Sequence, residues 1–185
     1  ILLKQIYNMI VITGGAGFIG SNLLEELNKI RVNTPIFLFD NIGKKRDNLK
    51  NLVYKSLYDK DELFNFLKIY QDKIKIIFHL GACTNTLENN WDYLIKNNYI
   101  YTKKLAIFCA RKNIKLIYAS SASVYGKSSG FQDETKNINN FIPLNLYAKS
   151  KLKFDKFLFQ NFKSNAKIIG LRYFNVYGGK EELKK

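Results

Sequence analysis

Tyr147 and Lys151 lie four residues apart in the segment Tyr147-Ala148-Lys149-Ser150-Lys151. Four residues make about one helical turn, so we expect both side chains on one face of a helix. A phenol has a pKa near ~10, and a tyrosine that removes protons at pH 7 needs a nearby positive charge that favours the phenolate. Lys151 can supply that charge, and the upstream Ser121 can hold a reacting oxygen by a hydrogen bond. The three residues predict acid–base chemistry.

A glycine-rich segment, Thr13-Gly14-Gly15-Ala16-Gly17-Phe18-Ile19-Gly20, follows a short apolar run and opens an amphipathic segment. Gly14 permits a tight turn, Gly17 lets the backbone approach a pyrophosphate, and Gly20 allows a helix to pack closely on a strand. The N-terminus of such a helix presents backbone N–H groups and a partial positive charge to phosphates. The pattern predicts a dinucleotide-binding turn.

Asp40 lies at the end of the next apolar run, where a carboxylate can bind the hydroxyls of a ribose. A carboxylate at this position repels a 2′-phosphate and so favours NAD. Lys44, Lys45 and Arg46 follow at once, however, and any of them can pair with the 2′-phosphate of NADP. The residues alone leave the choice between NAD and NADP open.

Short apolar runs alternate with longer helical segments, which is the pattern of a parallel sheet with crossover helices. The predicted fold class is therefore α/β, a doubly wound parallel sheet of the Rossmann type. All the motifs above fall at the carboxyl ends of predicted strands, where such sheets bind nucleotides. We expect strands near residues 9–13, 36–40, 52–57, 75–80, 115–120 and 167–173, and helices near residues 17–29, 59–70, 91–112 and 146–163.

The composition limits the classes of function. Hydrophobic residues make up 46% of the chain and aromatic residues 15%, as in a folded domain. No apolar run is long enough to span a membrane and the first residues lack the pattern of a signal peptide, so we expect a cytoplasmic protein. The net charge of +15 comes from scattered lysines, which favours anionic substrates without indicating a nucleic-acid partner. Cys83 and Cys109 lack metal-ligand spacing and are predicted to be small buried thiols, with no metal site.

Four segments together resemble the extended short-chain dehydrogenase/reductase superfamily: TGGAGFIG, YASSASVYG, YAKSK and RYFNVYG. Within it the chain is most similar to the ADP-L-glycero-D-manno-heptose 6-epimerases, through FHLGACTNT, NNYIYTKKL and PLNLYAKSKLKFD. The resemblance runs from about Met9 to Gly178. It implies NADP-dependent epimerisation at C6 of the heptose in ADP-D-glycero-D-manno-heptose, a precursor of the lipopolysaccharide inner core.

The resemblance also implies roles for single residues. The adenosine half and the phosphates of the cofactor would contact Phe18, Ile19, Asp40, Asn41, Lys45, Arg46 and Lys60. The rest of the cofactor would contact Leu80, Gly81, Ala82, Cys83, Thr84, Asn97 and Val176, with Asn175 beside the substrate. Ser121, Tyr147 and Lys151 would carry the chemistry. The family uses a second acid or base, a lysine shortly after the NVYG turn, and Lys184 is its counterpart by spacing.

The implied mechanism is a transient oxidation. Hydride would leave C6 of the sugar while a base removes the hydroxyl proton, and hydride would return to the other face of the ketone. Tyr147 would serve one face and Lys184 the other. Two alternatives stay open: another nucleotide-sugar 4-epimerase or 4,6-dehydratase, and an inactive dinucleotide-binding fragment. Ala122 and Ser123 stand where dehydratases carry acidic residues, which disfavours dehydration.

The two ends of the sequence give expectations about organisation. Met9, the only methionine, begins the first predicted strand, so we expect residues 1–8 to be an extension upstream of the natural start. We expect residues 9–185 to form an NAD(P)-binding domain that is incomplete at its C-terminal end and lacks the substrate domain. The helices near residues 91–112 and 146–163 resemble those through which family members assemble, so the full-length protein is expected to be a homo-oligomer.

Overall fold

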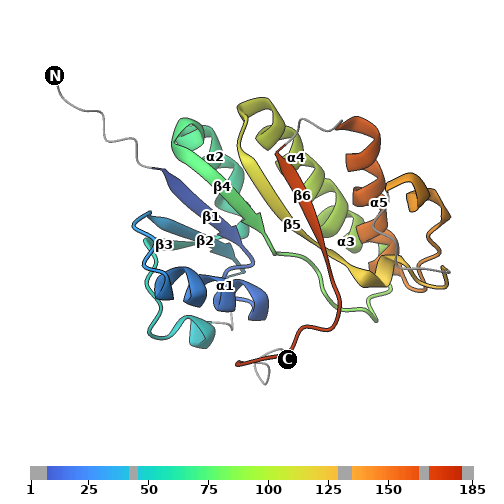
Figure 1. Cartoon of the computed structure of the whole chain (residues 1–185), viewed down its shortest axis with the longest axis horizontal. Helices are drawn as coiled ribbons and strands as arrows, with labels where there is room; N and C mark the ends of the chain where they lie inside the picture. Colours follow the sequence, from blue (N-terminus) through green and yellow to red (C-terminus); the bar gives the residue numbers. More distant parts are fainter. Residues whose placement is uncertain (1–7, 42–45, 129–134, 163–166, 181–185) are drawn as a thin grey trace. The chain divides into compact units, whose positions relative to one another are not determined.

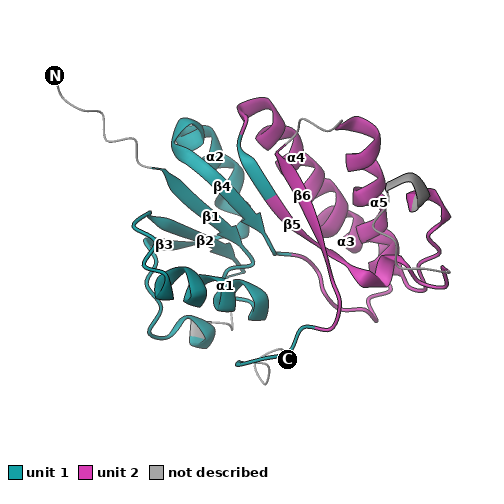
Figure 2. Cartoon of the chain, viewed as in Figure 1, with its two compact units in different colours: residues 1–81, 114–116, 176–185 teal, residues 82–113, 117–175 magenta. Residues whose placement is uncertain are grey.

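A computed structural model of the chain describes residues 8–41, 46–128, 135–162 and 167–180. Six strands follow one another in the sheet in the order β3-β2-β1-β4-β5-β6, with helices between them in sequence (Figure 1). The predicted α/β fold of the Rossmann type is confirmed. Two compact units make up the chain: unit 1 contains residues 1–81, 114–116 and 176–185, and unit 2 contains residues 82–113 and 117–175 (Figure 2).

Four parallel strands form the sheet of unit 1. The strand β1 (Met9–Thr13) pairs with β2 (Ile36–Asp40) on one side and with β4 (Ile74–His79) on the other, and β3 (Ser56–Asp59) pairs with β2. All five residues of β1 are buried. A strand buried on both faces is typical of a sheet with helices on each side.

Alternate residues of these strands face two different helices. Ile12 and Leu38 belong to one apolar cluster with Leu24 of α1 (Phe18–Lys29). Phe37 and Phe39 point the other way, because successive side chains alternate across a strand. Their rings lie 5.0 and 5.2 Å from that of Phe66 in α2 (Leu63–Tyr70). The helices α1 and α2 therefore cover opposite faces, as the doubly wound fold requires.

The helix expected near residues 59–70 is preceded by a cap at Asp59, which begins a short 3-10 helix, η2 (Lys60–Glu62), that leads into α2. The Asp59 side chain accepts a hydrogen bond from the Asp61 N–H (2.9 Å), and the Glu62 side chain accepts one from the Asp59 N–H (3.0 Å). This reciprocal pair satisfies two backbone donors at the start of the helix. Two other 3-10 helices in unit 1 are η1 (Arg46–Leu49) and η3 (Gln71–Lys73).

Most of β5 lies in unit 2, with β6 and the longer helices. The elements are α3 (Trp91–Leu94), η4 (Ile95–Ile100), α4 (Tyr101–Lys112), β5 (Lys115–Ser121), η5 (Ala122–Val124), η6 (Thr135–Asn140), α5 (Leu146–Asn161) and β6 (Ile168–Tyr173). Leu105, Leu116 and Phe154 are among the buried residues of α4, β5 and α5.

Three expectations need correction. The third strand begins at Ser56 and not near Leu52, because Leu52 and Tyr54 pack against the apolar cluster of unit 1 from an irregular segment. The helix expected over residues 91–112 contains the π-helical segment η4. Cys109 is buried, and burial raises the pKa of its thiol to about 12, but Cys83 is partly exposed. Both thiols are free.

Candidate active site

The glycine-rich turn joins β1 to α1 in unit 1. Gly14 has a φ of +69°, and a Cβ there would come within 2.5 Å of the Gly81 backbone nitrogen. A Cβ on Gly20 would collide with the carbonyl oxygen of Gly14. Glycine is therefore required at both positions, one for a left-handed turn and one for close approach of α1 to the turn.

Ala16, inside the turn, is held through both of its backbone polar groups. Its N–H donates to Oδ2 of Asp40 at the end of β2 (3.0 Å), and its carbonyl accepts from the Asn48 amide (2.8 Å). Asn48 lies in η1 and is buried. Asp40 thus stands where the motif predicts it and also fixes the shape of the turn. No motif identified Asn48, whose partner lies 32 residues away in sequence.

The remaining predicted cofactor residues of unit 1 gather around the turn or at strand ends. Phe18 and Ile19 open α1, the Asn41 N–H donates to Asp40 Oδ1 (2.8 Å), and Lys60 is the first residue of η2. The N–H groups of Leu80 and Gly81 donate to the carbonyl and hydroxyl oxygens of Thr13 (3.0 and 3.3 Å). Lys45, Lys184, the Arg46 side chain and residues 1–7 of the expected extension lie outside the described residues.

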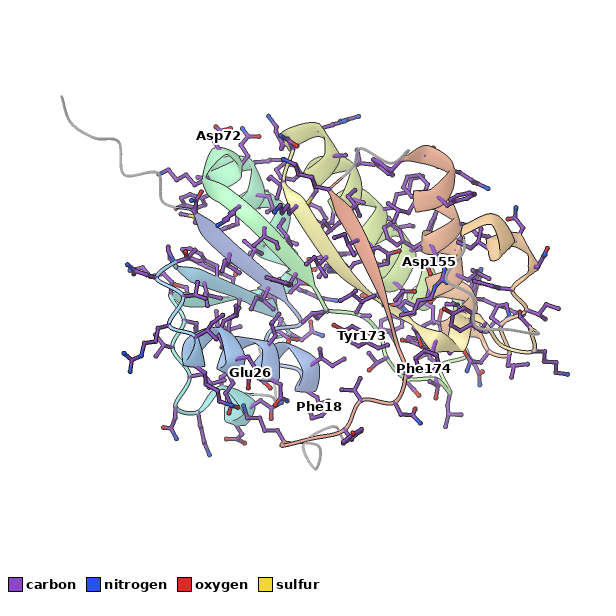
Figure 3. All side chains as sticks on the ribbon, in the orientation of Figure 1. Phe18, Glu26, Asp72, Asp155, Tyr173 and Phe174 are labelled. Atoms are coloured by element: carbon purple, nitrogen blue, oxygen red, sulfur yellow. The ribbon has the colours of Figure 1, made fainter. Side chains whose placement is uncertain are left out.

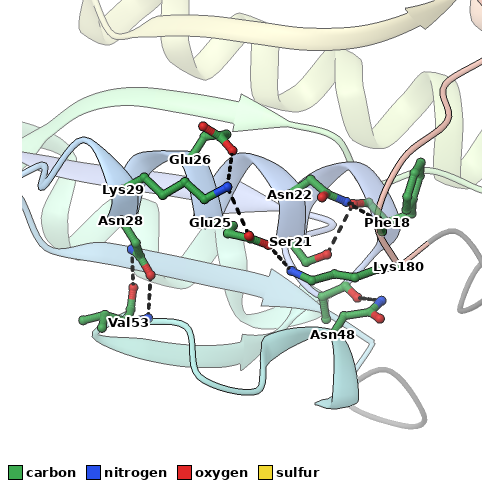
Figure 4. A network of polar contacts seen from close by, with 12 residues as sticks. Phe18, Ser21, Asn22, Glu25, Glu26, Asn28, Lys29, Asn48, Val53 and Lys180 are labelled. Carbon is green, nitrogen blue, oxygen red and sulfur yellow. Dashed lines mark hydrogen bonds and ion pairs between the residues drawn. The ribbon is translucent and has the colours of Figure 1, made fainter.

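The segment after β6 reaches α1 within unit 1 (Figure 4). The Lys180 ammonium lies 2.7 Å from the Glu25 carboxylate, and the Asn22 amide donates to the Gly179 carbonyl (3.3 Å). The predicted Val176 belongs to this segment and is half-buried, whereas Asn175, which belongs to unit 2, is exposed.

Ser121, Tyr147 and Lys151 come together in unit 2. Ser121 ends β5, and Tyr147 and Lys151 lie one turn apart on α5. The Ser121 hydroxyl is hydrogen-bonded to that of Ser123 (2.8 Å), and its interaction with Tyr147 lowers the pKa of the phenol. The Lys151 ammonium lies 6.0 Å from the centre of the Tyr147 ring and donates to the Ala119 carbonyl (2.9 Å). Asn145 caps α5 by accepting from the Ala148 N–H (2.8 Å), so the helix starts just before Tyr147 and places Tyr147 and Lys151 on the same face.

Burial changes the titration of both groups on α5. It raises the pKa of Tyr147 above the usual value for a phenol, and the interaction with Ser121 opposes that rise. Burial also lowers the pKa of Lys151 to about 8, against the effect of the Asp155 charge. The phenol is therefore protonated at neutral pH in the protein alone, and it needs a further positive charge nearby before it can act as a base.

Asn98 holds the segment after β4 to α5 within unit 2. It lies in the π-helical segment η4 and is 1% exposed. Its side chain accepts from the Cys83 N–H (2.8 Å) and donates to the Cys83 carbonyl (3.0 Å) and the Ser150 hydroxyl (3.0 Å). The segment Ala82–Thr84, which was predicted to contact the cofactor, is therefore held through the backbone of Cys83. The neighbouring Asn97, also a predicted contact, donates to the Tyr93 carbonyl instead (2.8 Å).

Comparison with known proteins places the chain in a family. The model of the NAD dependent epimerase/dehydratase family matches residues 10–184. The chain belongs to that family. It is 44% identical over 185 residues to the ADP-L-glycero-D-manno-heptose-6-epimerase of Brachyspira hyodysenteriae, covering 95% of this chain and 57% of that protein. The chain thus spans little more than half the length of this curated relative.

Solved structures agree with this assignment. The ADP-L-glycero-D-manno-heptose-6-epimerase of Helicobacter pylori has a TM-score of 0.82 and 31% identity, over 98% of this chain and 60% of that one. The UDP-glucuronic acid 4-epimerase of Bacillus cereus, in complex with NAD, has a TM-score of 0.73 and 30% identity, over 92% of this chain and 57% of that one. Both of these solved epimerases therefore share the arrangement of strands and helices described above.

The described part of the chain holds neither a membrane-spanning helix nor a cluster of metal-ligating side chains. None of its helices combines the length and the apolar character needed to cross a bilayer. Within the same residues, no three His, Cys, Asp or Glu side chains are grouped so that they could hold a metal ion.

Proposed function

We propose that the protein epimerises ADP-D-glycero-D-manno-heptose at C6 to the L-glycero form by transient oxidation with bound NADP. The reaction would take place in the cytoplasm and supply the lipopolysaccharide inner core. The observation that carries the proposal is the grouping of Ser121, Tyr147 and Lys151, with the Lys151 ammonium 6.0 Å from the centre of the Tyr147 ring, in a chain 44% identical to a protein of that name.

The chain's own residues fit a nicotinamide dinucleotide. The turn at Gly14–Gly17 brings backbone close to the start of α1, where no side chain caps the helix. Backbone N–H groups and the helix dipole at such a point favour a pyrophosphate. Asp40 offers the Oδ1 and Oδ2 atoms of its carboxylate beside the same turn, as a ribose requires. When bound, the dinucleotide would supply a reversible hydride acceptor.

Proton transfer is the task of the residues in unit 2. The Ser121 hydroxyl would hold the reacting oxygen of the sugar, and Tyr147 would take and return its proton. Lys151 would favour the phenolate of Tyr147 by its positive charge, which the hydrogen bond to the Ala119 carbonyl holds in place. Lys184, which lies outside the described residues, stays a prediction for the acid or base on the opposite face.

NADP is the cofactor we propose, because the resemblance points to it and Lys44, Lys45 and Arg46 directly follow Asp40. A charge-assisted contact to the 2′-phosphate is worth roughly 1.5–3 kcal/mol. Isothermal titration should therefore show NADP binding about tenfold or more tighter than NAD. Equal affinities would remove the proposed 2′-phosphate contact.

The experiment that tests the function uses the natural gene product and its proposed substrate. ADP-D-glycero-D-manno-heptose is incubated with the protein, and the two epimers are separated and counted. Tyr147→Phe should lower kcat by at least about a hundredfold, because it removes the acid–base group and little else. Tyr93→Phe, a change at an exposed ring, should leave kcat unchanged.

The same assay separates the alternatives. Conversion of a UDP-sugar at C4 but not of the ADP-heptose would favour a 4-epimerase, to which the similarity is lower, at a TM-score of 0.73 against 0.82. Dinucleotide binding without turnover of any sugar would indicate an inactive binding protein. Full activity of Tyr147→Phe would overturn the role given to the tyrosine.

A further inference from the structure

Asp155, the last residue of the stretch PLNLYAKSKLKFD, is a buried carboxylate on α5 for which the sequence predicts no role (Figure 3). It lies one helical turn beyond Lys151 and two turns beyond Tyr147, so all three share one face of the helix. Its exposed fraction is only 3%. A carboxylate in such a place must be hydrogen-bonded or paired, because burying an unpaired charge is very unfavourable.

Three donors from two strands meet this carboxylate. The Tyr118 hydroxyl donates to Oδ1 (2.8 Å), and the Ser120 hydroxyl donates to Oδ2 (2.8 Å). The Nε of Arg172 on β6 also donates to Oδ2 (3.2 Å). The Arg172 guanidinium also lies over the rings of Tyr125 and Phe141, 5.1 and 5.0 Å from their centres. Asp155 thus joins α5 to both β5 and β6.

These contacts involve the residues next to Ser121 in the chain. Ser120, a partner of Asp155, immediately precedes Ser121, and Ala119, which precedes Ser120, accepts from Lys151 (2.9 Å). Two adjacent turns of α5 therefore bind consecutive residues at the end of β5. This attachment fixes the backbone just before Ser121, whose hydroxyl is held in turn by the hydroxyl and the N–H of Ser123 (2.8 and 3.2 Å).

Charge leads to the same conclusion as geometry. Burial raises the pKa of Asp155, while the hydrogen bonds from Ser120 and Tyr118 and the charge of Arg172 oppose the rise. Because all three donors direct hydrogens at the carboxylate oxygens, the network stabilises the ionised form. That negative charge acts on Lys151 against burial, which lowers the pKa of the lysine to about 8. The other titratable groups facing Lys151 are Tyr147 on α5 and Cys83 in the segment after β4.

We propose that Asp155 is a positioning residue of the reaction: it fixes the end of β5 to α5 and supplies the negative charge that keeps Lys151 an ammonium. The inference deepens the proposed function and rests on it only in giving proton transfer to Tyr147 and Lys151.

The test measures the protonation of Lys151 without any substrate. Lysines of the natural gene product are labelled with an amine-reactive reagent at a series of pH values and counted by peptide mass spectrometry, with the exposed Lys149 as internal standard. The labelling midpoint of Lys151 should lie near 8 in the parent protein. In Asp155→Asn it should fall by on the order of one pH unit, because an opposite charge has been lost. Ser120→Ala, which keeps the charge, should leave the midpoint near that of the parent but lower kcat.

The outcomes separate this inference from the proposed function. An unchanged Lys151 midpoint in Asp155→Asn would overturn the role of Asp155, whether or not the protein epimerises a sugar. A lower midpoint in a protein without epimerase activity would support the role and remove the function. If Asp155→Asn does not fold, carbon-13 NMR of the Asp155 carboxyl in the parent protein replaces it. A step at the Lys151 midpoint is then expected, and a flat signal would contradict the coupling.

Discussion

At the scale of residues, burial shifts the pKa values of Tyr147 and Lys151 in opposite directions. Burial keeps the phenol protonated and also makes the ammonium unusually easy to deprotonate, with a pKa of about 8. The spacing of the two residues could be predicted from sequence because it lies within one helical turn. The partners that set their chemistry could not. Asp155 accepts hydrogen bonds from Tyr118 and Ser120, which lie 37 and 35 residues away in sequence, and such contacts exist only after the strand and the helix have packed.

The pH dependence follows from the lowered pKa of Lys151. The rate should fall as pH rises through about 8, because the ammonium that favours the phenolate is lost there. The effect of this group on stability has the opposite sign. Between about 8 and the ordinary lysine pKa of 10.5 the unfolded chain holds the lysine proton and the folded chain does not, so stability rises with pH over that range. We therefore expect kcat to fall above pH 8 without a loss of melting temperature that Lys151 causes. If the melting temperature falls over the same pH range in both the parent protein and Lys151→Arg, the loss of kcat is due to unfolding and not to deprotonation of Lys151.

At the scale of elements, most strands could be predicted from the short apolar runs that alternate with helical segments, and the glycine turn from the spacing of its glycines. The π-helical segment η4 could not be predicted, because the apolar spacing over residues 91–112 is that of an ordinary helix. Its effect is to place Asn98 against Cys83 and Ser150. The strand β3 was misplaced for a related reason: Leu52 and Tyr54 are apolar and buried against a core without belonging to a ladder.

The turn gives a prediction about binding. Gly20→Ala would drive a methyl group into the Gly14 carbonyl, so α1 must move away from the turn. We expect dinucleotide affinity to fall by at least about tenfold, a loss of about 1.4 kcal/mol, in calorimetric titration. Gly179→Ala is the matched control, because a Cβ there meets nothing within 4 Å. Equal losses in the two variants would show that the effect is not steric.

The hydrogen bonds of Asn98 in η4 give a prediction about stability. Asn98→Ala leaves the Cys83 backbone and the Ser150 hydroxyl without their buried partner, and should cost about 1–3 kcal/mol in the free energy of unfolding. Asn161→Ala removes only an exposed bond to the Phe157 carbonyl and should change that energy by less than about 0.5 kcal/mol. Denaturant titration of both variants measures the difference. A similar small change in both would mean that the segment after β4 is held by other contacts.

At the scale of the whole molecule, the residues proposed to recognise a dinucleotide lie mainly in unit 1 and the proposed acid–base residues Ser121, Tyr147 and Lys151 lie in unit 2. Sequence patterns predict both sets because each depends on local spacing after a strand. They could not settle the sugar, since the chain covers 57% of its Brachyspira relative and the predicted substrate contacts are only Ser121 and Asn175. Homo-oligomer formation through the helices near residues 91–112 and 146–163 stays a prediction, which light scattering on the natural gene product can test.

The central claim is that the sugar is oxidised and reduced within one turnover, so that the hydrogen on C6 never leaves the protein for solvent. The direct test is epimerisation of ADP-D-glycero-D-manno-heptose in deuterium oxide, with the product examined by proton NMR and mass spectrometry. We expect inversion at C6 with no deuterium on that carbon in the product. Deuterium at C6 of the product would contradict it, because the proton would then have been exchanged by a base without hydride transfer.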